Sequence, residues 1–257
     1  MKRGKRRVAP QSYRHRSYRT MVGDDGLVSC RIQVRDTDLL ILADRDVNVL
    51  ARELTLQYRL QVEAYIQRYP HFLTSLRTLP EDFLAPAVVR AMLAAGAAAG
   101  VGPMAAVAGA IAEYVGAGLR VAGCDEVVVE NGGDIFLHRY CDCTVAIFAG
   151  ESPLSLRLGL HLPAGTMPLA VCTSSGTVGH SLSFGRADSV TVVAGSAALA
   201  DAVATRLGNE VGRSGEGDGG IAHALEIGRR IGGVRGVVVI CGEQMGAVGE
   251  VELIRIS

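Results

Sequence analysis

The chain has 257 residues, with 26 basic side chains, 26 acidic side chains and 49% hydrophobic residues. Its only lysines are Lys2 and Lys5, so the remainder of the chain has no amine side chain. This excludes a Schiff-base lysine, a pyridoxal-phosphate anchor and a P-loop lysine, because each needs an amine within the folded domain. Arginine can still hold phosphate or carboxylate, but it does not act as a nucleophile.

The charge is unevenly distributed. Residues 1–20 carry eight basic and no acidic side chains, which leaves a net charge of −8 on residues 21–257. We therefore predict a basic N-terminal arm (1–20) followed by a single domain (21–257). The arm fits either a solvated tail or a phosphate contact, and the acidic body argues against a nucleic-acid partner. No apolar segment of a signal peptide follows the basic start, so we expect a cytoplasmic protein with reduced thiols.

The first third of the chain predicts strands and then a long helix. Cys30, Ile32 and Val34 alternate with polar residues, as in a half-buried strand. A helical repeat of apolar residues continues until Pro70, and Asp44 or Asp46 can cap its start. The predicted elements are strands at 10–20, 28–35 and 39–43 and a helix at 44–68.

An uncharged stretch, residues 91–112, is long enough to span a bilayer. It consists mostly of alanine and glycine, and the glycines around Gly102 with Pro103 interrupt it. We therefore predict two packed helices, 87–98 and 103–122, and no membrane partner. The glycine-rich turn between them fits either a simple connection or an anion site at the start of a helix, with Gly102 as the binding residue.

The rest of the chain returns to strands, then helices, then strands. We predict that Ser196 caps a helix that ends at Leu207, where Gly208-Asn209 provides a left-handed stop, and that a mobile loop covers 208–220. This order occurs twice without strict strand–helix alternation, which favours an α+β fold with antiparallel sheets. The predicted elements are strands at 126–130, 135–138, 144–149, 154–162, 169–172, 189–194, 237–241 and 251–256, and helices at 196–207 and 221–231.

Two glycine-containing loops are candidate ligand sites. In the first, Asn131-Gly132-Gly133-Asp134, the glycines allow close approach of a ligand and the polar side chains lie at the lip; a plain hairpin turn is the alternative. In the second, Thr173-Ser174-Ser175-Gly176, N–H and O–H donors can hold phosphate; a surface loop is the alternative. Nearby, His180 is the candidate for proton transfer.

A third motif lies on the helix after Ser196. Asp201 and Thr205 are one turn apart, opposite the apolar face, and can together ligate a hard cation such as Mg²⁺. A solvated helix face is the alternative. Elsewhere, Cys141 and Cys143 are one residue apart, which is not the spacing of a structural zinc site. They leave open a reactive or sulfur-carrying thiol.

These motifs occur in the order found in the ApbE family of flavin transferases. Asn131–Ile135 resembles the family's Asn-x-Gly-Gly-Asp-Ile, Thr173–Gly176 its Thr-Ser-Gly loop, and Ala200–Thr205 its Asp-Ala-x-x-Thr metal helix. The resemblance implies a T-fold-like α+β structure with two similar halves, and as cofactors Mg²⁺ and FAD or another nucleotide. T-fold proteins often assemble through sheet edges, so by analogy a homo-oligomer is expected.

The departures from ApbE are informative. The family's Lys-Gly-Tyr-Ala segment is replaced by Gly102-Pro103-Met104-Ala105, and the Asp-Pro expected after His180 is missing. The chain is closer to the uncharacterised cytosolic ApbE-like family of anaerobic bacteria and archaea, through residues 99–109. Members of that family are linked to homocysteine formation from sulfide. Three hypotheses remain open: a Mg²⁺-assisted pocket for a nucleotide or flavin-type small molecule, a sulfide-assimilation factor with a reactive cysteine, and a non-catalytic interaction module.

Overall fold

The computed structural model of the protein describes residues 26–175, 187–211 and 219–256. The basic arm, the predicted strand 10–20, Gly176, His180 and most of the predicted loop 208–220 lie outside these residues.

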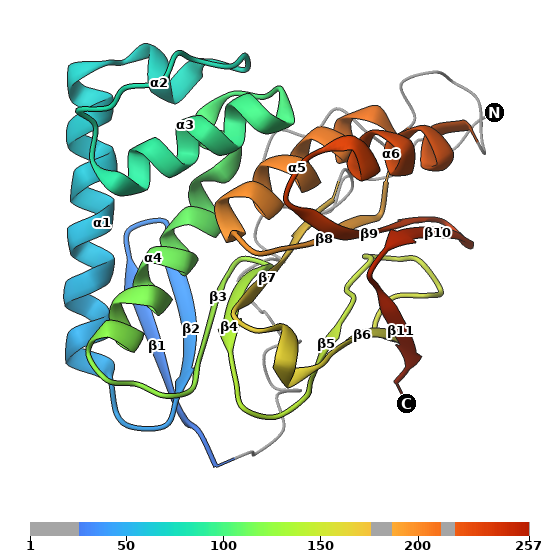
Figure 1. Ribbon diagram of the computed structural model, residues 1–257, viewed down its shortest axis with the longest axis horizontal. Helices are drawn as coiled ribbons and strands as arrows, with labels where there is room; N and C mark the ends of the chain where they lie inside the picture. The colour runs from blue at the N-terminus through green and yellow to red at the C-terminus, as the bar shows by residue number, and fades with distance from the viewer. Residues whose placement is uncertain (1–25, 176–186, 212–218, 257) are drawn as a thin grey trace.

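One large sheet organises the molecule (Figure 1). Its eight strands run in the order β1-β2-β3-β4-β7-β8-β9-β10, and every neighbouring pair is antiparallel. This confirms the predicted α+β class with an antiparallel sheet. The strands are β1 (Val28–Val34), β2 (Thr37–Ala43), β3 (Val127–Asn131), β4 (Asp134–His138), β7 (Leu169–Ser174), β8 (Ser189–Ala194), β9 (Val234–Cys241) and β10 (Gln244–Gly249).

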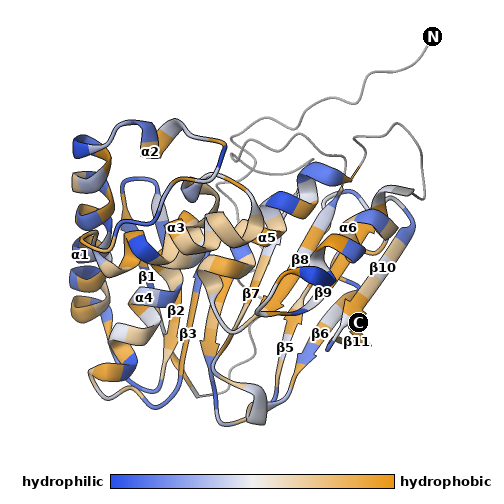
Figure 2. Cartoon of the chain, turned by 45° about the horizontal axis from the view of Figure 1, so that its top comes forward, coloured by the Kyte–Doolittle hydropathy of each residue, from blue (hydrophilic) through white to orange (hydrophobic). Residues whose placement is uncertain are grey.

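Helices cover one face of this sheet (Figures 1 and 2). The helix α4 packs on β3 and β4, α5 on β7 and β8, and α6 on β9 and β10; α1 packs on β1, and α3 packs on α5 and η3. The helices are α1 (Asn48–Arg68), α2 (His71–Thr74), α3 (Ala87–Ala99), α4 (Val107–Val121), α5 (Ala197–Glu210) and α6 (Gly219–Arg230), with 3₁₀ turns η3 (Pro103–Ala106) and η4 (Ala164–Thr166).

The chain order divides the large sheet into two similar halves. In the first half, β1 and β2 are followed by helices and then by β3 and β4; in the second, β7 and β8 are followed by α5 and α6 and then by β9 and β10. The two halves meet where β4 pairs with β7. Residues at this junction therefore come from both halves.

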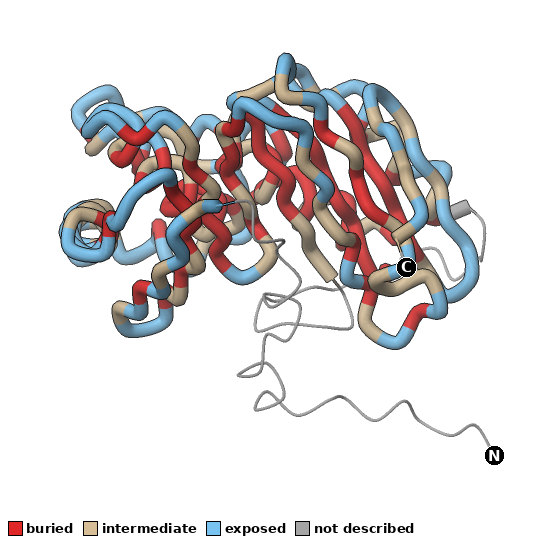
Figure 3. The backbone as a smooth tube through the Cα atoms, turned by 90° about the horizontal axis from the view of Figure 1, so that it is seen from below, coloured by how far each residue is buried: buried red, intermediate tan, exposed pale blue. Residues whose placement is uncertain are grey.

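A second, three-stranded sheet covers the other face of the large sheet. Its order is β11-β6-β5, with β5 at Cys143–Ala146, β6 at Leu158–Leu162 and β11 at Glu252–Arg255. Leu160 and Leu162 from β6 pack against Leu169, Val193 and Ile240 from the large sheet. Side chains therefore cover both faces of strands β7 to β9, and all of β8 is buried. Figure 3 shows these long buried segments in the sheet.

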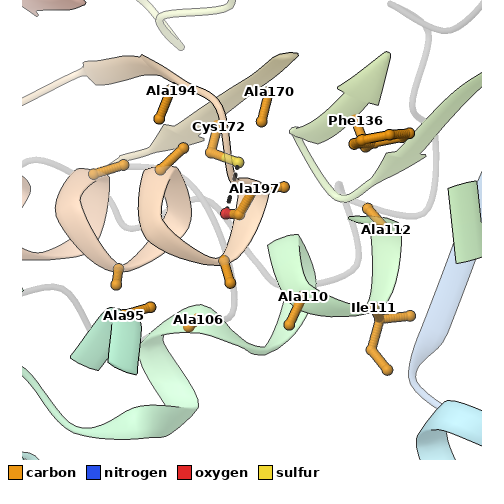
Figure 4. Packing of buried hydrophobic residues seen from close by; sticks show 14 of the residues in the cluster. Ala95, Ala106, Ala110, Ile111, Ala112, Phe136, Ala170, Cys172, Ala194 and Ala197 are labelled. Atoms are coloured by element: carbon orange, nitrogen blue, oxygen red, sulfur yellow. Dashed lines mark hydrogen bonds between the residues drawn. The ribbon is translucent and has the colours of Figure 1, made fainter. Parts of the chain in front are cut away.

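Small residues let the helices approach closely. Ala106, Ala110 and Ala197 lie between α4, η3 and α5 (Figure 4). At Gly109 an added Cβ atom would overlap the carbonyl oxygen of Ala197, so this position requires glycine. The alanine- and glycine-rich stretch thus serves helix packing, as predicted.

By length and composition alone, Pro103–Val121 could cross a membrane; among the described residues no other helix meets that test. In the fold, its helical part α4 packs against α1, α5, β3 and β4. This contact pattern is that of a core helix.

Several predicted boundaries were wrong. The helix α5 continues to Glu210, so Gly208-Asn209 lies inside the helix and provides no left-handed stop. The predicted strand 154–162 begins only at Leu158, because the preceding residues form turns. The segment before β11, where we predicted no strand, contains β10, which pairs along its whole length with β9. The long helix begins at Asn48, whose N–H is accepted by Asp46 at 2.9 Å.

Candidate functional site

Strand pairing brings the first two motifs together. In the β3–β4 hairpin, Asn131 stands opposite Asp134, and in the β4–β7 pair Asp134 stands opposite Cys172. The connecting glycines, Gly132 and Gly133, have φ of 71° and 107°, which only glycine adopts without strain. Because side chains alternate across a sheet, Asp134 and Cys172 share the helix-covered face with the core residue Phe136.

The third motif, which contains Asp201, lies on α5 above the junction of β4 and β7. The Asp201 carboxylate oxygen Oδ2 accepts a hydrogen bond from the Gly109 N–H at 2.9 Å, near the start of α4. The Asn131 amide donates to the Ala108 carbonyl at 3.0 Å. The Cys172 thiol lies 3.4 Å from the Ala197 carbonyl and within hydrogen-bond reach of Asp134. Both halves of the molecule and the helix layer therefore converge on a carboxylate cluster, which we define as Asp134 and Asp201.

The two carboxylates of this cluster lack a compensating charge. Burial raises the pKa of Asp134 well above its usual value, and the nearby charges of Asp201 and Glu130 raise it further. Burial also raises the pKa of Asp201 to about 7, although N–H donors from Gly109 and Ala108 oppose the shift. Among the described residues, no basic side chain pairs with either group, and the Asp134 oxygen Oδ1 is buried without a hydrogen-bond partner.

Two helices adjoining the cluster cap each other. Asp201 of α5 accepts from the N-terminal turn of α4, and Glu113 of α4 accepts from Ala197 N–H at 2.6 Å and Ala198 N–H at 3.1 Å, at the start of α5. The predicted cap is confirmed as well, since the Ser196 hydroxyl accepts from Leu199 N–H at 3.4 Å. Each carboxylate thus satisfies free N–H groups at the positive end of the other helix, which fixes the position of α5 over the sheet.

The other predicted ligand residues lie at different distances from the cluster. Thr205 is half-buried one turn after Asp201 on α5, and Ser174 and Ser175 lie at the end of β7. The Thr173 hydroxyl contacts the Thr191 hydroxyl at 3.0 Å, so its side chain is engaged along the β7–β8 pair, while its N–H donates to Asp134. At Gly102 an added Cβ atom would overlap the carbonyl oxygen of Ser75, so this glycine allows close packing against the segment at residues 75–76.

The described residues contain no group of three His, Cys, Asp or Glu side chains arranged to hold a metal ion. A cation at the carboxylate cluster would therefore need oxygen atoms from hydroxyl groups, water or a bound ligand. Mg²⁺ commonly binds in that manner, with one or two carboxylates and the phosphate groups of a ligand.

Sequence reasoning missed Glu113 as a functional neighbour. It precedes the residues that it caps by more than 80 positions, and its surroundings on α4 show only an ordinary helix repeat. Cys172 and Glu130 directly precede the two loop motifs in the sequence, but their interaction with Asp134 depends on strand register, which the sequence does not specify at that precision.

The fold is that of the ApbE flavin transferases. The apo form of flavinyl transferase ApbE from Pseudomonas stutzeri superimposes with a TM-score of 0.53 at 12% identity, covering 86% of this chain and 93% of that one. Flavin transferase ApbE from Vibrio cholerae gives a TM-score of 0.53 at 14% identity, covering 86% and 96%. At these identities the likeness concerns the fold alone.

Within that class, sequence similarity defines the family. A family model described as AbpE bacteria matches residues 19–253, and the chain belongs to this family. It is 40% identical over 228 residues to a UPF0280 protein of Methanococcus aeolicus, covering 88% of this chain and 91% of that protein. It is 39% identical over 229 residues to a UPF0280 protein of Methanocaldococcus jannaschii, covering 88% and 92%. The predicted divergence from the transferases themselves is thereby confirmed.

Proposed function

We propose that the protein binds a nucleotide or flavin-type ligand together with a divalent cation such as Mg²⁺ at the carboxylate cluster. The observation that carries this proposal is the un-neutralised pair, Asp134 and Asp201. Asp134 is buried and Asp201 is half-buried, and the charge of Asp201 acts on Asp134; without a basic partner, such a pair is stabilised by taking up a proton or by binding a cation. An orphaned buried oxygen on Asp134 is where a ligand, a proton or water would be accommodated.

The surrounding residues fit a Mg²⁺–phosphate ligand. Asp201 and Thr205 would hold the cation, and the ligand's own phosphate oxygens would complete its coordination. Asn131, Gly132 and Gly133 and the backbone of residues 173–176 would border the ligand. A bound cation would supply charge neutralisation for the phosphates. His180 remains our candidate for proton transfer.

Standard flavin transfer to a protein is not our proposal. The lysine that ApbE proteins carry before the Asn-x-Gly-Gly-Asp motif is absent here, and no other lysine follows Lys5. The structural neighbours are nevertheless named as flavin transferases, so flavins are the first ligands to test. The protein we propose is a relative that retains a ligand pocket with altered chemistry.

Isothermal calorimetry tests this proposal directly. FAD, FMN and ADP are titrated into the full-length chain with and without Mg²⁺, and into the variant Asp201→Asn. The matched control is Asp142→Asn, which replaces an exposed carboxylate in the turn between β4 and β5. We expect Mg²⁺-dependent binding that Asp201→Asn weakens about 100-fold and Asp142→Asn leaves unchanged. If none of the three ligands binds, the result would instead favour the non-catalytic interaction module.

A second candidate function is a role in assimilating sulfide into homocysteine. The observation that favours it is the exposed thiol of Cys141, which lies 3.2 Å from the guanidinium of Arg139. Deleting the gene in a sulfate-reducing or methanogenic host that has no second copy tests the pathway. We expect growth to depend on added homocysteine or methionine, and normal growth without either would exclude this role.

For the setting of either function, we propose a cytoplasmic protein whose partner is a small molecule rather than a membrane or a nucleic acid, assembled as a homo-oligomer. Size-exclusion chromatography with light scattering measures the assembly, and a monomer at micromolar concentration would contradict it.

A further inference from the structure

A second cluster of reactive side chains lies at the other end of β4. Asp134 begins this strand and His138 ends it, so the residues that follow are separated from the carboxylate cluster by the length of the strand. We define the thiol cluster as Arg139, Cys141 and Cys143 with Glu126. No residue of the thiol cluster belongs to the carboxylate cluster described above.

A buried ion pair holds the guanidinium in place. Arg139 is 5% exposed, and its Nε donates to Glu126 Oε1 at 3.1 Å. The same carboxylate oxygen accepts the Tyr140 N–H at 2.8 Å, which ties the turn to the end of the sheet. Asp142 anchors the turn from its other side, because its Oδ1 accepts the Ala164 N–H at 2.9 Å. The position of the guanidinium is therefore fixed before any reagent arrives.

Cys141 is the cysteine that contacts the Arg139 guanidinium. The Arg139 Nη2 atom lies 3.2 Å from the Cys141 sulfur. All six cysteines of the chain are among the described residues, and Cys141 alone is classed as exposed, while Cys124 and Cys172 are buried and the others are half-buried. A fixed guanidinium N–H donor beside an exposed sulfur that small reagents can reach is the environment of a reactive cysteine.

Cys143 supplies a second thiol next to the first. Its sulfur lies 3.5 Å from the backbone carbonyl oxygen of Cys141. It begins β5, whose pairing with β6 fixes its backbone. A thiol two residues from a reactive cysteine can displace a group that has been attached to that cysteine.

We propose that Cys141 is a nucleophilic thiol that exchanges with low-molecular-weight disulfides, with Cys143 as the resolving thiol. The Cys141 thiolate attacks one sulfur of a disulfide RSSR; a Cys141–SR bond forms, the S–S bond of the reagent breaks, and RS⁻ leaves. The Cys143 thiolate then attacks the Cys141 sulfur, forming a Cys141–Cys143 disulfide and releasing the second RS⁻. Two protein thiols are oxidised, one small disulfide is reduced to two thiols, and the two protons from the cysteines go to the released thiolates.

The inference concerns the reactivity of the thiol itself and rests on neither proposed function. Glutathione disulfide is the probe, added to the reduced full-length protein; acid-quenched samples are mapped by mass spectrometry. We expect a glutathione adduct on Cys141 at a rate about tenfold above that of Cys30 or Cys241, followed by loss of the adduct and formation of the Cys141–Cys143 disulfide. Equal rates at Cys141 and the half-buried cysteines would overturn the proposal without any variant being made.

Variants assign the roles. Cys143→Ser should accumulate the Cys141 adduct, Cys141→Ser should abolish the fast reaction, and Cys241→Ser, the matched control, should change neither step. Replacing both members of the ion pair (Glu126→Gln with Arg139→Gln) should slow Cys141 about tenfold and leave Cys241 unaffected. The single variant Arg139→Lys keeps a positive charge beside Cys141, so its Cys141 rate should lie between those of the double variant and the wild type. A wild-type rate at Cys141 in the double variant would contradict the role of Arg139, and rapid loss of the adduct in Cys143→Ser would contradict that of Cys143.

Discussion

The two ends of β4 carry clusters of opposite electrostatic character. At its start, Asp134 and Asp201 are two acids without a basic partner among the described residues, and the pKa of each is raised. After its end, Arg139 and Glu126 are a matched pair, and the Tyr140 N–H together with the Arg139 guanidinium lowers the pKa of Glu126. The first cluster is incomplete until a proton or a cation joins it, whereas the second is complete within the chain. Removing one charge should therefore change the free energy of unfolding in opposite directions at the two ends of β4.

The largest effect on stability is expected at the Arg139–Glu126 ion pair. Replacing Arg139 by Met leaves Glu126, whose side chain is only 21% exposed, without its ion-pair partner. We expect the free energy of unfolding to fall by about 3 kcal/mol, measured by urea denaturation. Arg35→Met is the control, because Arg35 is 71% exposed and Glu63 keeps its ion pair with Arg59, so the loss should be less than about 1 kcal/mol. Equal losses in the two variants would remove the distinction between a buried and an exposed pair.

An intermediate effect is expected at Thr205. The variant Thr205→Val keeps the side-chain shape but removes the hydroxyl that we assign to the cation. The affinity for a Mg²⁺–nucleotide should fall about tenfold in calorimetry, with little change in stability. Thr166→Val, whose hydroxyl donates to the Pro163 carbonyl on the other side of the sheet, should bind as the wild type does. If Thr205→Val also binds unchanged, the cation does not contact this hydroxyl.

The smallest effect has the opposite sign from that of Arg139→Met. In Asp134→Asn the amide oxygen can still accept from the Thr173 N–H, and the new NH₂ group takes the place of the orphaned oxygen beside Asp201. Without divalent cations at pH 8, we expect the variant to be about 1 kcal/mol more stable than the wild type. A loss of stability of that size would mean that the Asp134 charge is already compensated.

The same pair predicts a pH dependence. The pKa of Asp201 rises from 3.8 when unfolded to about 7 when folded. Between those values the folded chain holds more protons than the unfolded chain, so without divalent cations stability should fall as the pH rises from about 4 to 7. Thermal midpoints measured across this range should show a shallower slope in Asp201→Asn. A wild-type thermal midpoint that rises between pH 4 and pH 7 would contradict this prediction.

Local patterns in the sequence predicted most of the helices and strands but not which of them contact each other. The alternation around Ile32, the capping Ser196 and the glycines of the β3–β4 turn act within a few residues, so each was readable and each was confirmed. Strand β10 was missed because Gln244–Gly249 has little strand character, and pairing with β9 stabilises it. The helix stop at Gly208 was wrong because packing of α5 on the sheet overrides the local preference of glycine.

The carboxylate cluster shows the same limit. Asp134 and Asp201 were each identified from a motif, and the resemblance to ApbE placed both in a single site. The effect of the Asp201 charge on the pKa of Asp134, the Asp201 contact with Gly109 and the cap that Glu113 provides depend on how α4 and α5 cross. That crossing is determined by tertiary packing at Gly109 and its alanine neighbours, which no local pattern encodes.

The central claim is that a divalent cation completes the carboxylate cluster, and Mn²⁺ as a paramagnetic substitute for Mg²⁺ tests it most directly. Electron paramagnetic resonance measures free Mn²⁺ as it is titrated into the full-length protein in the presence of FAD or ADP. We predict that the wild-type protein removes a stoichiometric amount of Mn²⁺ from solution at pH 8 and that Asp201→Asn removes none. Free Mn²⁺ at the level of a protein-free sample in every wild-type titration, or equal uptake by Asp201→Asn, would contradict the claim.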